Sequence, residues 1–344
     1  MQESATLTEA DLALANALQL DPRAPWSRLA GPLGLDPATL SRRWARLRAS
    51  GSAWVTCYPG GAQAEYAAFA LVQVACAPGT CEETAALLSG DGRVYSVEIT
   101  AGAFGLLLTV AALDHASLAA YVLRRLGRLP GITGTRTHLV QRIYREASRW
   151  RMDALSQRQQ RGLERAAAER AGAEPAGVDE QRLVIALAAD GRQSYAQLGE
   201  TLGKPESTVR RTLAAALGSG RAVVRCETAH LMAGWRVTAT LWLAVPPGEL
   251  EQTAETLCAM RQARLVCSVA GEANLLVQVW LHGLGELSRF EAQLAERRPA
   301  ARVLERSVTF TWVKRMGRVL DALGRSLAYV PMNVRDGDRT SRGG

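Results

Sequence analysis

The sequence predicts an α+β protein in which two short helical domains alternate with two domains of order β-α-β-β-α-β. Three observations predict this. The chain has 344 residues, more than one ordinary domain needs. Similar residues recur at one constant spacing along the chain. In each copy, a helical pattern comes first and alternating strand and helix patterns follow.

The repeat is visible as matched residues that lie 169 positions apart. Leu29–Gly34 corresponds to Leu198–Gly203. The same offset pairs Leu14 with Leu183, Thr39 with Thr208, Arg42 with Arg211, Ser50-Gly51 with Ser219-Gly220, Cys57 with Cys226 and Pro130 with Pro299. It holds from about residue 11 to residue 150 without a gap. The chain is therefore predicted to contain two copies of one unit of about 150 residues.

Composition limits the class of protein. Hydrophobic residues make up 48% and charged residues 22%, as in ordinary globular proteins. No apolar run approaches the roughly 20 residues of a spanning helix, and no signal segment opens the chain, so we expect a cytoplasmic protein without a membrane partner. Six Cys without a C-x-x-C motif or a paired His predict neither a zinc site nor a disulfide framework, and no cofactor is expected. The net charge of +8 favours anionic partners, nucleic acid first.

The repeat and the composition shifts predict these domain boundaries: a winged helix-turn-helix at 1–60, a ferredoxin-like domain at 64–152, a linker at 153–177, a second winged helix-turn-helix at 178–229, a second ferredoxin-like domain at 233–330 and a disordered tail at 331–344. The linker is rich in Arg, Gln, Ala and Glu and is expected to be partly helical. The tail has no apolar residue after Val334.

The first helical domain has a signal at each helix end. A helix that starts at Thr8 or Asp11 is expected to end at Asp21-Pro22. The next, Trp26–Leu33, stops at Gly34. The third runs from Pro37 to Ser50 with Asp36 as N-cap, and a strand that begins at Ala53 should form the wing. The second copy is expected to form helices at Asp179–Asp190, Ser194–Leu202 and Glu206–Gly218.

A helix-turn-helix projects the polar face of its last helix into the major groove, where arginine suits guanine edges and phosphates. The predicted DNA-binding residues are Thr39, Ser41, Arg42, Arg43 and Arg46 in the first copy and Ser207, Thr208, Arg210 and Arg211 in the second. The last helix of the second copy carries fewer arginines and one acidic residue. We therefore expect the last helix of the first copy to make most of the DNA contacts. The alternative is that these arginines form only a solvated helix face.

The rest of each copy alternates strands and helices. In the first copy the expected order is strand, helix, strand, strand, helix, strand at Tyr66–Cys76, Thr80–Leu88, Arg93–Thr100, Phe104–Ala112, Asp114–Leu126 and Ile132–Tyr144. In the second copy it is Trp235–Val245, Glu249–Arg261, Ala263–Ala270, Ala273–Leu281, Gly285–Arg297 and Ala301–Val313. Helices cover one face of such a sheet, and the other face should be apolar and pair with the second copy.

Several segments resemble the Lrp/AsnC family of transcriptional regulators. They are Leu29-Ala30, Leu33–Asp36, Thr39, Arg42-Arg43, Leu47, Ser50-Gly51, Gly102 before an apolar strand, and Val313–Arg318. The resemblance covers both copies and implies a dimer fused into one chain, which binds double-stranded DNA and associates further as a dimer of pseudo-dimers. It implies an amino acid or related metabolite as effector, bound at a turn of pattern Gly-x-x-Asp. The corresponding turns are Gly102, Ala103, Phe104 and Gly105, and Gly271, Glu272, Ala273 and Asn274. Neither turn has the acid, and plain hairpin glycines are the alternative.

A rival assignment is an enzyme. Siroheme decarboxylases resemble this family and also contain two such units; their chemistry requires His and Arg. The strands Phe104–Ala112 and Ala273–Leu281 contain no His. The four histidines, His115, His138, His230 and His282, do not match one another under the 169-residue offset. We therefore predict no catalytic residues and a protein that is not an enzyme.

Overall fold

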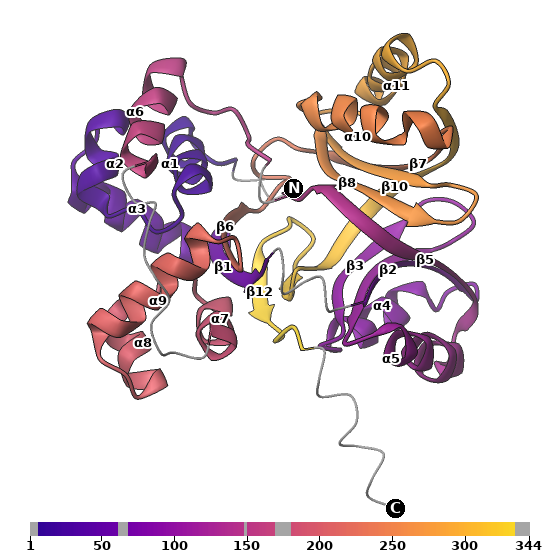
Figure 1. Cartoon of the computed structure of the whole chain (residues 1–344), viewed down its shortest axis with the longest axis horizontal. Coiled ribbons are helices and arrows are strands. Elements are labelled where there is room, and N and C mark those ends of the chain that lie inside the picture. Colours follow the sequence, from indigo (N-terminus) through magenta and orange to yellow (C-terminus); the bar gives the residue numbers. More distant parts are fainter. Residues whose placement is uncertain (1–5, 61–67, 148–149, 169–179, 334–344) are drawn as a thin grey trace, which may run out of the picture. The chain divides into compact units, whose positions relative to one another are not determined.

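The structure is a computed structural model, and it describes residues 6–60, 68–147, 150–168 and 180–333. The chain forms two compact units, each built from segments far apart in the sequence (Figure 1). The first consists of Met1–Tyr66, Arg151–Ala233 and Leu323–Ser326. The second consists of Ala67–Trp150, Gly234–Ala322 and Leu327–Gly344. No helix in the described ranges is both long and apolar enough to cross a bilayer.

The first unit begins with the three expected helices, α1 (Glu9–Leu20), α2 (Trp26–Leu33) and α3 (Pro37–Ala49). The Thr8 hydroxyl caps α1 and the Asp36 carboxylate caps α3, each accepting a backbone N–H of the first turn. Gly34, with φ of 66°, ends α2 in the left-handed conformation that glycine adopts without strain. Leu40, Trp44 and Leu47 of α3 are buried against α1 and α2. The remaining face of α3 is left toward solvent.

A second set of three helices follows the same order: α7 (Glu180–Ala188), α8 (Tyr195–Leu202) and α9 (Glu206–Gly218). Ser194 and Gln197 form a capping box at the start of α8, and Gly203, with φ of 64°, ends it. Leu198, Val209 and Leu213 are fully buried in the core of this set. Asp179, the expected first residue of α7, lies outside the described residues.

The segment expected to link the two copies contains helix α6 (Gln157–Ala168). Leu163, only 2% exposed, packs into the same core as Leu14, Leu18 and Trp44. This helix therefore adds a fourth element to the first helical set. Residues 169–177 of the expected linker lie outside the described residues.

The strand after each helical set does not form the wing expected from the sequence. β1 (Ala53–Pro59) pairs antiparallel with β6 (Ala222–Thr228), and together they form a separate two-stranded sheet. The register centres on Thr56 opposite Arg225. Cys57 of β1 packs in the core of α7–α9, and Cys226 of β6 packs in the core of α1–α3. The two strands thus connect the helical sets, because β1 and β6 each contribute side chains to both cores.

The second unit contains the twelve strands and helices expected from the sequence, in the predicted order, together with shorter elements. The first six are β2 (Ala68–Cys76), α4 (Cys81–Ser89), β3 (Val94–Thr100), β4 (Leu106–Ala112), α5 (His115–Ala120) and β5 (Ile132–Arg145). The next six are β7 (Val237–Ala244), α10 (Leu250–Ala259), β8 (Ala263–Ala270), β9 (Leu275–Leu281), α11 (Gly285–Arg297) and β10 (Arg302–Arg315). After α5 the chain continues as a π-helical turn, Tyr121–Arg125, and a 3₁₀ turn, Leu126–Arg128. The longer helix expected over Asp114–Leu126 is therefore divided.

The eight strands β2–β5 and β7–β10 close on themselves. Each set of four is antiparallel in the order fourth, first, third, second, and the edges of the two sets join through β5–β8 and β10–β3. The expected pairing of the copies therefore occurs edge to edge. Two apolar cores lie between the sheet and its helices, one around Val72 and Leu108 and the other around Leu241 and Val277.

The inner face of the closed sheet differs from the apolar face expected. It holds an apolar cluster around Leu71, Leu107 and Trp242. It also buries polar side chains, among them Gln73 and Glu98. Short strands β11 (Arg318–Leu320) and β12 (Ser326–Tyr329) extend the sheet at β10. Of the expected tail, Asn333 still donates its backbone N–H to the Gly92 carbonyl at 3.0 Å, and residues 334–344 lie outside the described residues.

Candidate nucleic-acid interface

The exposed face of α3 carries the hydroxyls and arginines that the sequence singled out. Arg42 and Arg46 are exposed, and Thr39, Ser41 and Arg43 are half-buried. Arg42 donates an Nη2–H to the Thr39 hydroxyl at 3.2 Å. Because α3 contains no acidic residue, its outer face presents positive charge and hydroxyl donors. This combination suits phosphate oxygens and guanine edges.

Two of these arginines are held by a buried carboxylate that the sequence analysis did not connect with them. Asp11 of α1, 4% exposed, accepts from Arg43 Nη1 at 3.0 Å and from Arg46 Nη2 at 3.0 Å. Burial raises the pKa of Asp11, but the hydrogen bonds from Thr8 and Arg43 and the charge of Arg46 outweigh it, so the net pKa lies below its ordinary value. Asp11 therefore fixes the direction of both side chains and neutralises part of their charge.

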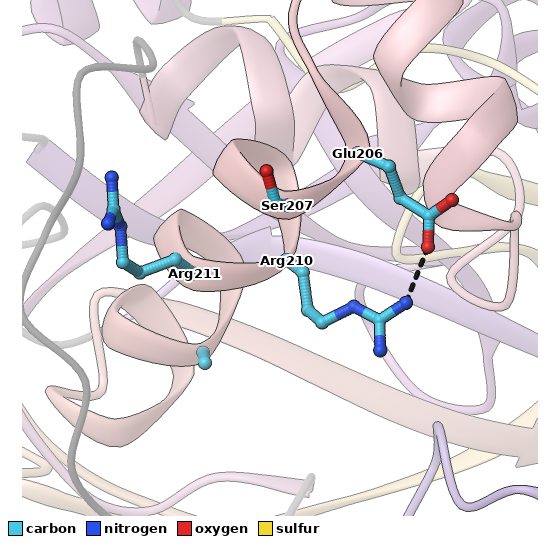
Figure 2. A pocket seen from close by; sticks show the side chains of 5 residues that line it. Glu206, Ser207, Arg210 and Arg211 are labelled. Atoms are coloured by element: carbon cyan, nitrogen blue, oxygen red, sulfur yellow. Dashed lines mark hydrogen bonds and ion pairs between the residues drawn. The ribbon is translucent and has the colours of Figure 1, made fainter.

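The corresponding face of α9 lines a shallow depression. Figure 2 shows its lining residues, Glu206, Ser207, Arg210, Arg211 and Ala214. Arg210 forms an ion pair with Glu206 one turn earlier and lies over the Tyr195 ring, 4.8 Å from its centroid. Arg211 points away from this pair and has no hydrogen bond or ion pair to any residue that the structure describes. Thr208 is half-buried beside them.

The structure thus brings the predicted residues together in two separate groups, one on each last helix. The two groups differ in their carboxylates. In the first group, the buried carboxylate of Asp11, on another helix, forms ion pairs with Arg43 and Arg46. In the second, an exposed acid on the same helix competes for Arg210 at the surface. Sequence spacing could predict the second contact, because residues i and i+4 adjoin on a helix, but not the first.

The two turns expected to bind an effector lie in the second unit. Gly102 and Gly271 have φ of 113° and 153°, so both turns use backbone that favours glycine. In the first turn, Arg136 stacks on Phe104 with its Cζ 4.6 Å from the ring centroid, and Ala103 and Gly105 complete the turn. In the second, the Asn274 amide makes two hydrogen bonds, of 2.9 and 2.8 Å, to the backbone of Val245. Ala273 is buried in the inner cluster, which leaves Glu272 as the exposed polar side chain of that turn.

Comparison with known protein families gives matches in the first half of the chain. The AsnC-type helix-turn-helix domain matches residues 7–48, and the Lrp/AsnC ligand binding domain matches residues 69–150. An uncharacterised HTH-type transcriptional regulator of Pyrococcus furiosus is 30% identical over 114 residues, which span 32% of this chain and 76% of that protein. A second such regulator, from Pyrococcus abyssi, is 29% identical over 134 residues, 38% of this chain and 83% of that protein.

The chain belongs to the Lrp/AsnC family. The Lrp/AsnC helix-turn-helix match contains α1, α2 and most of α3, and the Lrp/AsnC ligand binding match covers the strands and helices from β2 to β5.

Similarity to solved structures extends over more of this Lrp/AsnC chain. The siroheme decarboxylase NirDL has a TM-score of 0.55 at 12% identity and covers 93% of this chain and 95% of its own. Its complex with an iron-uroporphyrin III analogue has a TM-score of 0.53 and covers 86% of this chain and 88% of its own. At this identity the similarity concerns the fold alone.

The inner face of the closed sheet holds a polar cluster that the sequence analysis missed. His138 Nε2 lies 3.2 Å from Gln73 Oε1, and Gln73 donates its amide N–H to Glu305 at 2.5 Å. Arg136 completes the cluster with an ion pair to Glu305 at 2.8 Å. The His138 ring packs against Trp242, with centroids 4.1 Å apart. Alternation along β5 puts Arg136 and His138 on one face, but the partner strands could not be deduced from the sequence.

The two cysteines that the 169-residue offset pairs are both buried. Burial raises the pKa of Cys57 and of Cys226 to about 12, so both thiols stay protonated and poorly reactive. Within the described ranges, no group of three His, Cys, Asp or Glu side chains is placed to hold a metal.

Proposed function

We propose that this Lrp/AsnC chain is a sequence-specific DNA-binding transcriptional regulator made of two tandem copies of one unit. Each copy consists of a helix-turn-helix and a ferredoxin-like domain. The observation that carries the proposal is the face of α3, where Thr39, Ser41, Arg42, Arg43 and Arg46 gather on the last helix of a helix-turn-helix. The names of the Pyrococcus relatives, both HTH-type transcriptional regulators, agree with it.

Within this proposal α3 makes most of the DNA contacts and α9 contributes fewer. Arg43 and Arg46 are pre-ordered by Asp11, which lowers the entropy lost when they contact phosphate. Arg210 must share its charge with Glu206. The bound DNA is then a pseudo-palindrome with unequal half-sites, because the two last helices differ in sequence.

A mobility-shift assay tests the function directly. The probe is DNA from upstream of the protein's own gene and its neighbours, at two salt concentrations and with excess nonspecific competitor. We expect a shift that survives competitor and weakens as salt rises, since phosphate contacts release counterions. A protein that shifts none of these fragments, with and without amino acids added, would contradict the proposal.

A separate experiment compares the contributions of α3 and α9 to DNA affinity. Replacing Arg42, Arg43 and Arg46 by Ala should cost more affinity than replacing Arg210 and Arg211 by Ala. The reverse order would overturn the assignment of α3 as the main contact. Arg289→Ala, which removes an exposed arginine of α11 in the other unit, is the matched control and should leave affinity unchanged.

We further propose an amino acid or related metabolite as effector, bound near the turns Gly102–Gly105 and Gly271–Asn274, and a dimer of such chains as the assembly. Glu272 is the one acidic side chain in these two turns. Thermal stabilisation by individual amino acids, with and without Glu272→Gln, tests the effector, and sedimentation velocity tests the assembly.

A second candidate is an enzyme similar to siroheme decarboxylase. It is supported by the fold similarity over 93% of the chain and by the Arg136–His138 cluster inside the closed sheet. Titration with an iron-uroporphyrin would produce a shifted Soret band if this candidate were correct. We rank it second because His138 packs against Trp242 and hydrogen-bonds Gln73, which is the environment of a core histidine.

A further inference from the structure

Two arginines of the first unit make the same contacts in opposite directions. Arg23 lies in the turn between α1 and α2, and it donates to the carbonyls of Gly191 at 2.5 Å and Gln193 at 2.9 Å. Arg192 lies in the turn between α7 and α8, and it donates to the carbonyls of Pro22 at 2.7 Å and Ala24 at 2.9 Å. Each guanidinium thus bridges the carbonyls on either side of the other arginine.

Each of the two arginines also stacks on an aromatic ring of the opposite helical set. The Arg23 guanidinium lies over Tyr195, the first residue of α8, with its Cζ 4.8 Å from the ring centroid. The Arg192 guanidinium lies over Trp26, the first residue of α2, at 4.0 Å. Each of these arginine contacts made by one turn is therefore returned by the other, as a two-fold axis between the two helical sets requires.

The arrangement places two positive charges close together and out of water. Burial lowers the pKa of Arg192 to about 10, and the charge of Arg23 contributes to the shift. Arg192 still remains charged at neutral pH. Four carbonyl acceptors and two ring faces compensate for the desolvation and the mutual repulsion. Such contacts hold a guanidinium in one geometry, because its donors form a rigid planar fork.

These contacts matter because the remaining connection between the sets includes the sheet of β1 and β6. A two-stranded ribbon is marginally stable by itself, and this one depends on the two helical cores that bury its side chains. The turns that carry Arg23 and Arg192 precede α2 and α8, the helices that support α3 and α9. Locking the two turns together therefore limits rotation of α3 relative to α9.

We propose that Arg23 and Arg192 form a reciprocal clamp that fixes the orientation of α3 relative to α9 and so sets the spacing of the two DNA half-sites. The inference rests on the proposed DNA-binding function. Both guanidiniums are engaged by the opposite turn and its aromatic ring, so both arginines are positioning residues. A rigid pair of last helices binds both half-sites at one spacing, near a multiple of about 10.5 base pairs, with the benefit of a high effective concentration. A loosened pair loses that benefit and tolerates other spacings.

The test uses the full chain with Arg23→Lys, with Arg192→Lys and with both. Lysine keeps the charge, so the net field on DNA does not change, but it removes the forked bonds and most of the stacking. Arg289→Lys on exposed α11 is the matched control. Thermal unfolding of each variant establishes that it folds, and the single Arg23→Lys variant serves if the double variant does not.

Two measurements are made on each variant. The first is the distance distribution between spin-labelled non-natural amino acids at exposed positions 49 and 218, at the ends of α3 and α9, without DNA. The second is affinity for a DNA series in which base pairs are inserted one at a time between the half-sites. We expect the clamp variants to broaden the distance distribution, to lose roughly tenfold in affinity at the preferred spacing and to flatten the spacing preference.

The outcomes separate the clamp from the proposed function. A distribution and a spacing preference that both match the control would overturn the clamp while DNA binding stands. A broadened distribution with an unchanged spacing preference would overturn its role in setting half-site spacing. If the unmodified chain binds no DNA, the proposed function fails together with the spacing role, and the DNA-free distances alone then decide whether the arginines hold the two helical sets.

Discussion

Arg136 and Glu305 lie 169 residues apart, which is the offset between equivalent positions in the proposed repeat, and they form an ion pair with Nη1 and Oε2 separated by 2.8 Å. A residue that contacts its own equivalent lies on the two-fold axis that relates the copies. In a symmetric pair of identical copies, this contact would place two like charges together. The opposite charges found here favour pairing of the first copy with the second over pairing of either copy with itself.

Charge reversal at this contact tests that preference. Glu305→Arg puts two arginines together and should lower the free energy of unfolding by about 1 kcal/mol, since both side chains are partly exposed. The double variant Arg136→Glu with Glu305→Arg should recover most of the loss. Urea denaturation of the unmodified chain, the two single variants and the double variant measures the coupling energy between the two residues. If the double variant loses as much free energy of unfolding as the two single variants together, the contact does not favour pairing of the first copy with the second.

Asp11 offers a test of stability and of DNA contact together. Asp11→Asn should destabilise the fold by about 2 kcal/mol, because it removes the buried charge that holds two arginines. It should also weaken DNA binding, since Arg43 and Arg46 lose their fixed direction. Denaturation and mobility shift measure the two effects, and Asp190→Asn, at the half-exposed ion pair with Arg48, is the comparison.

The same carboxylate predicts the response to acid. The pKa of Asp11 is lower in the folded chain than its ordinary value of 3.8. Its contribution to stability is therefore fully present above about pH 4 and is lost as pH falls below that value. Unfolding free energies measured between pH 5 and pH 2.5 should fall less steeply for Asp11→Asn than for the unmodified chain. Equal slopes would rule out this linkage.

Glu98 predicts the opposite pH dependence. It is 3% exposed, accepts from Gln278 at 3.0 Å and hydrogen-bonds Thr309, and burial raises its pKa to about 7 against 4.5 unfolded, with the charge of Arg315 opposing the rise. The folded chain then binds more protons than the unfolded chain between these values. Stability falls as pH rises from about 4.5 to about 7.

Glu98→Gln keeps the hydrogen bonds without the charge. We expect it to reduce the loss of stability between pH 5 and pH 8 and to stabilise the fold at pH 8. The exposed carboxyl of Glu255, changed to Gln, is the control and should leave the slope as it is. Chemical denaturation at the two pH values decides the matter, and a variant as pH-dependent as the unmodified chain would refute the assignment.

Leu163 tests whether α6 belongs to the first helical set. Leu163→Ala should cost about 2–4 kcal/mol, as expected for a leucine removed from a closed core. The nearby exposed Gln160, changed to Ala, should cost far less. A loss below about 0.5 kcal/mol for Leu163→Ala would show that α6 does not stabilise the core.

Much of the local structure could be predicted from the sequence because its causes are local. The caps Thr8 and Asp36 and the stop at Gly34 lie within four residues of the helix ends that they define. The alternation of side chains between the two faces of the sheet along β2 to β5 follows because successive residues of a strand face opposite sides. The positions of Arg42 and Arg211 on their helices follow from helical periodicity in the same way.

The wing shows where such reasoning fails. The sequence correctly predicts a strand at Ala53, but an isolated strand does not determine its partner, because backbone donors and acceptors pair with any suitably placed edge. Tertiary structure pairs β1 with β6 and buries Cys57 and Cys226 in the opposite helical cores. The helical part of the expected linker occurs as α6, but its packing could not be predicted for a similar reason: one leucine, Leu163, gives little periodicity and yet fills a core built by other helices.

The sequence by itself determined the 169-residue spacing of matched residues, the first helix-turn-helix and the order of strands and helices, since these depend on residue type and on patterns of spacing along the chain. Only the tertiary structure decided which strand edges close the sheet, that Asp11 holds Arg43 and Arg46, and that Arg23 and Arg192 exchange contacts. Each of these joins groups distant along the chain. Their pairing depends on burial, and on the fact that buried charges and backbone carbonyls need hydrogen-bonding partners. Local sequence patterns cannot predict which distant groups become those partners.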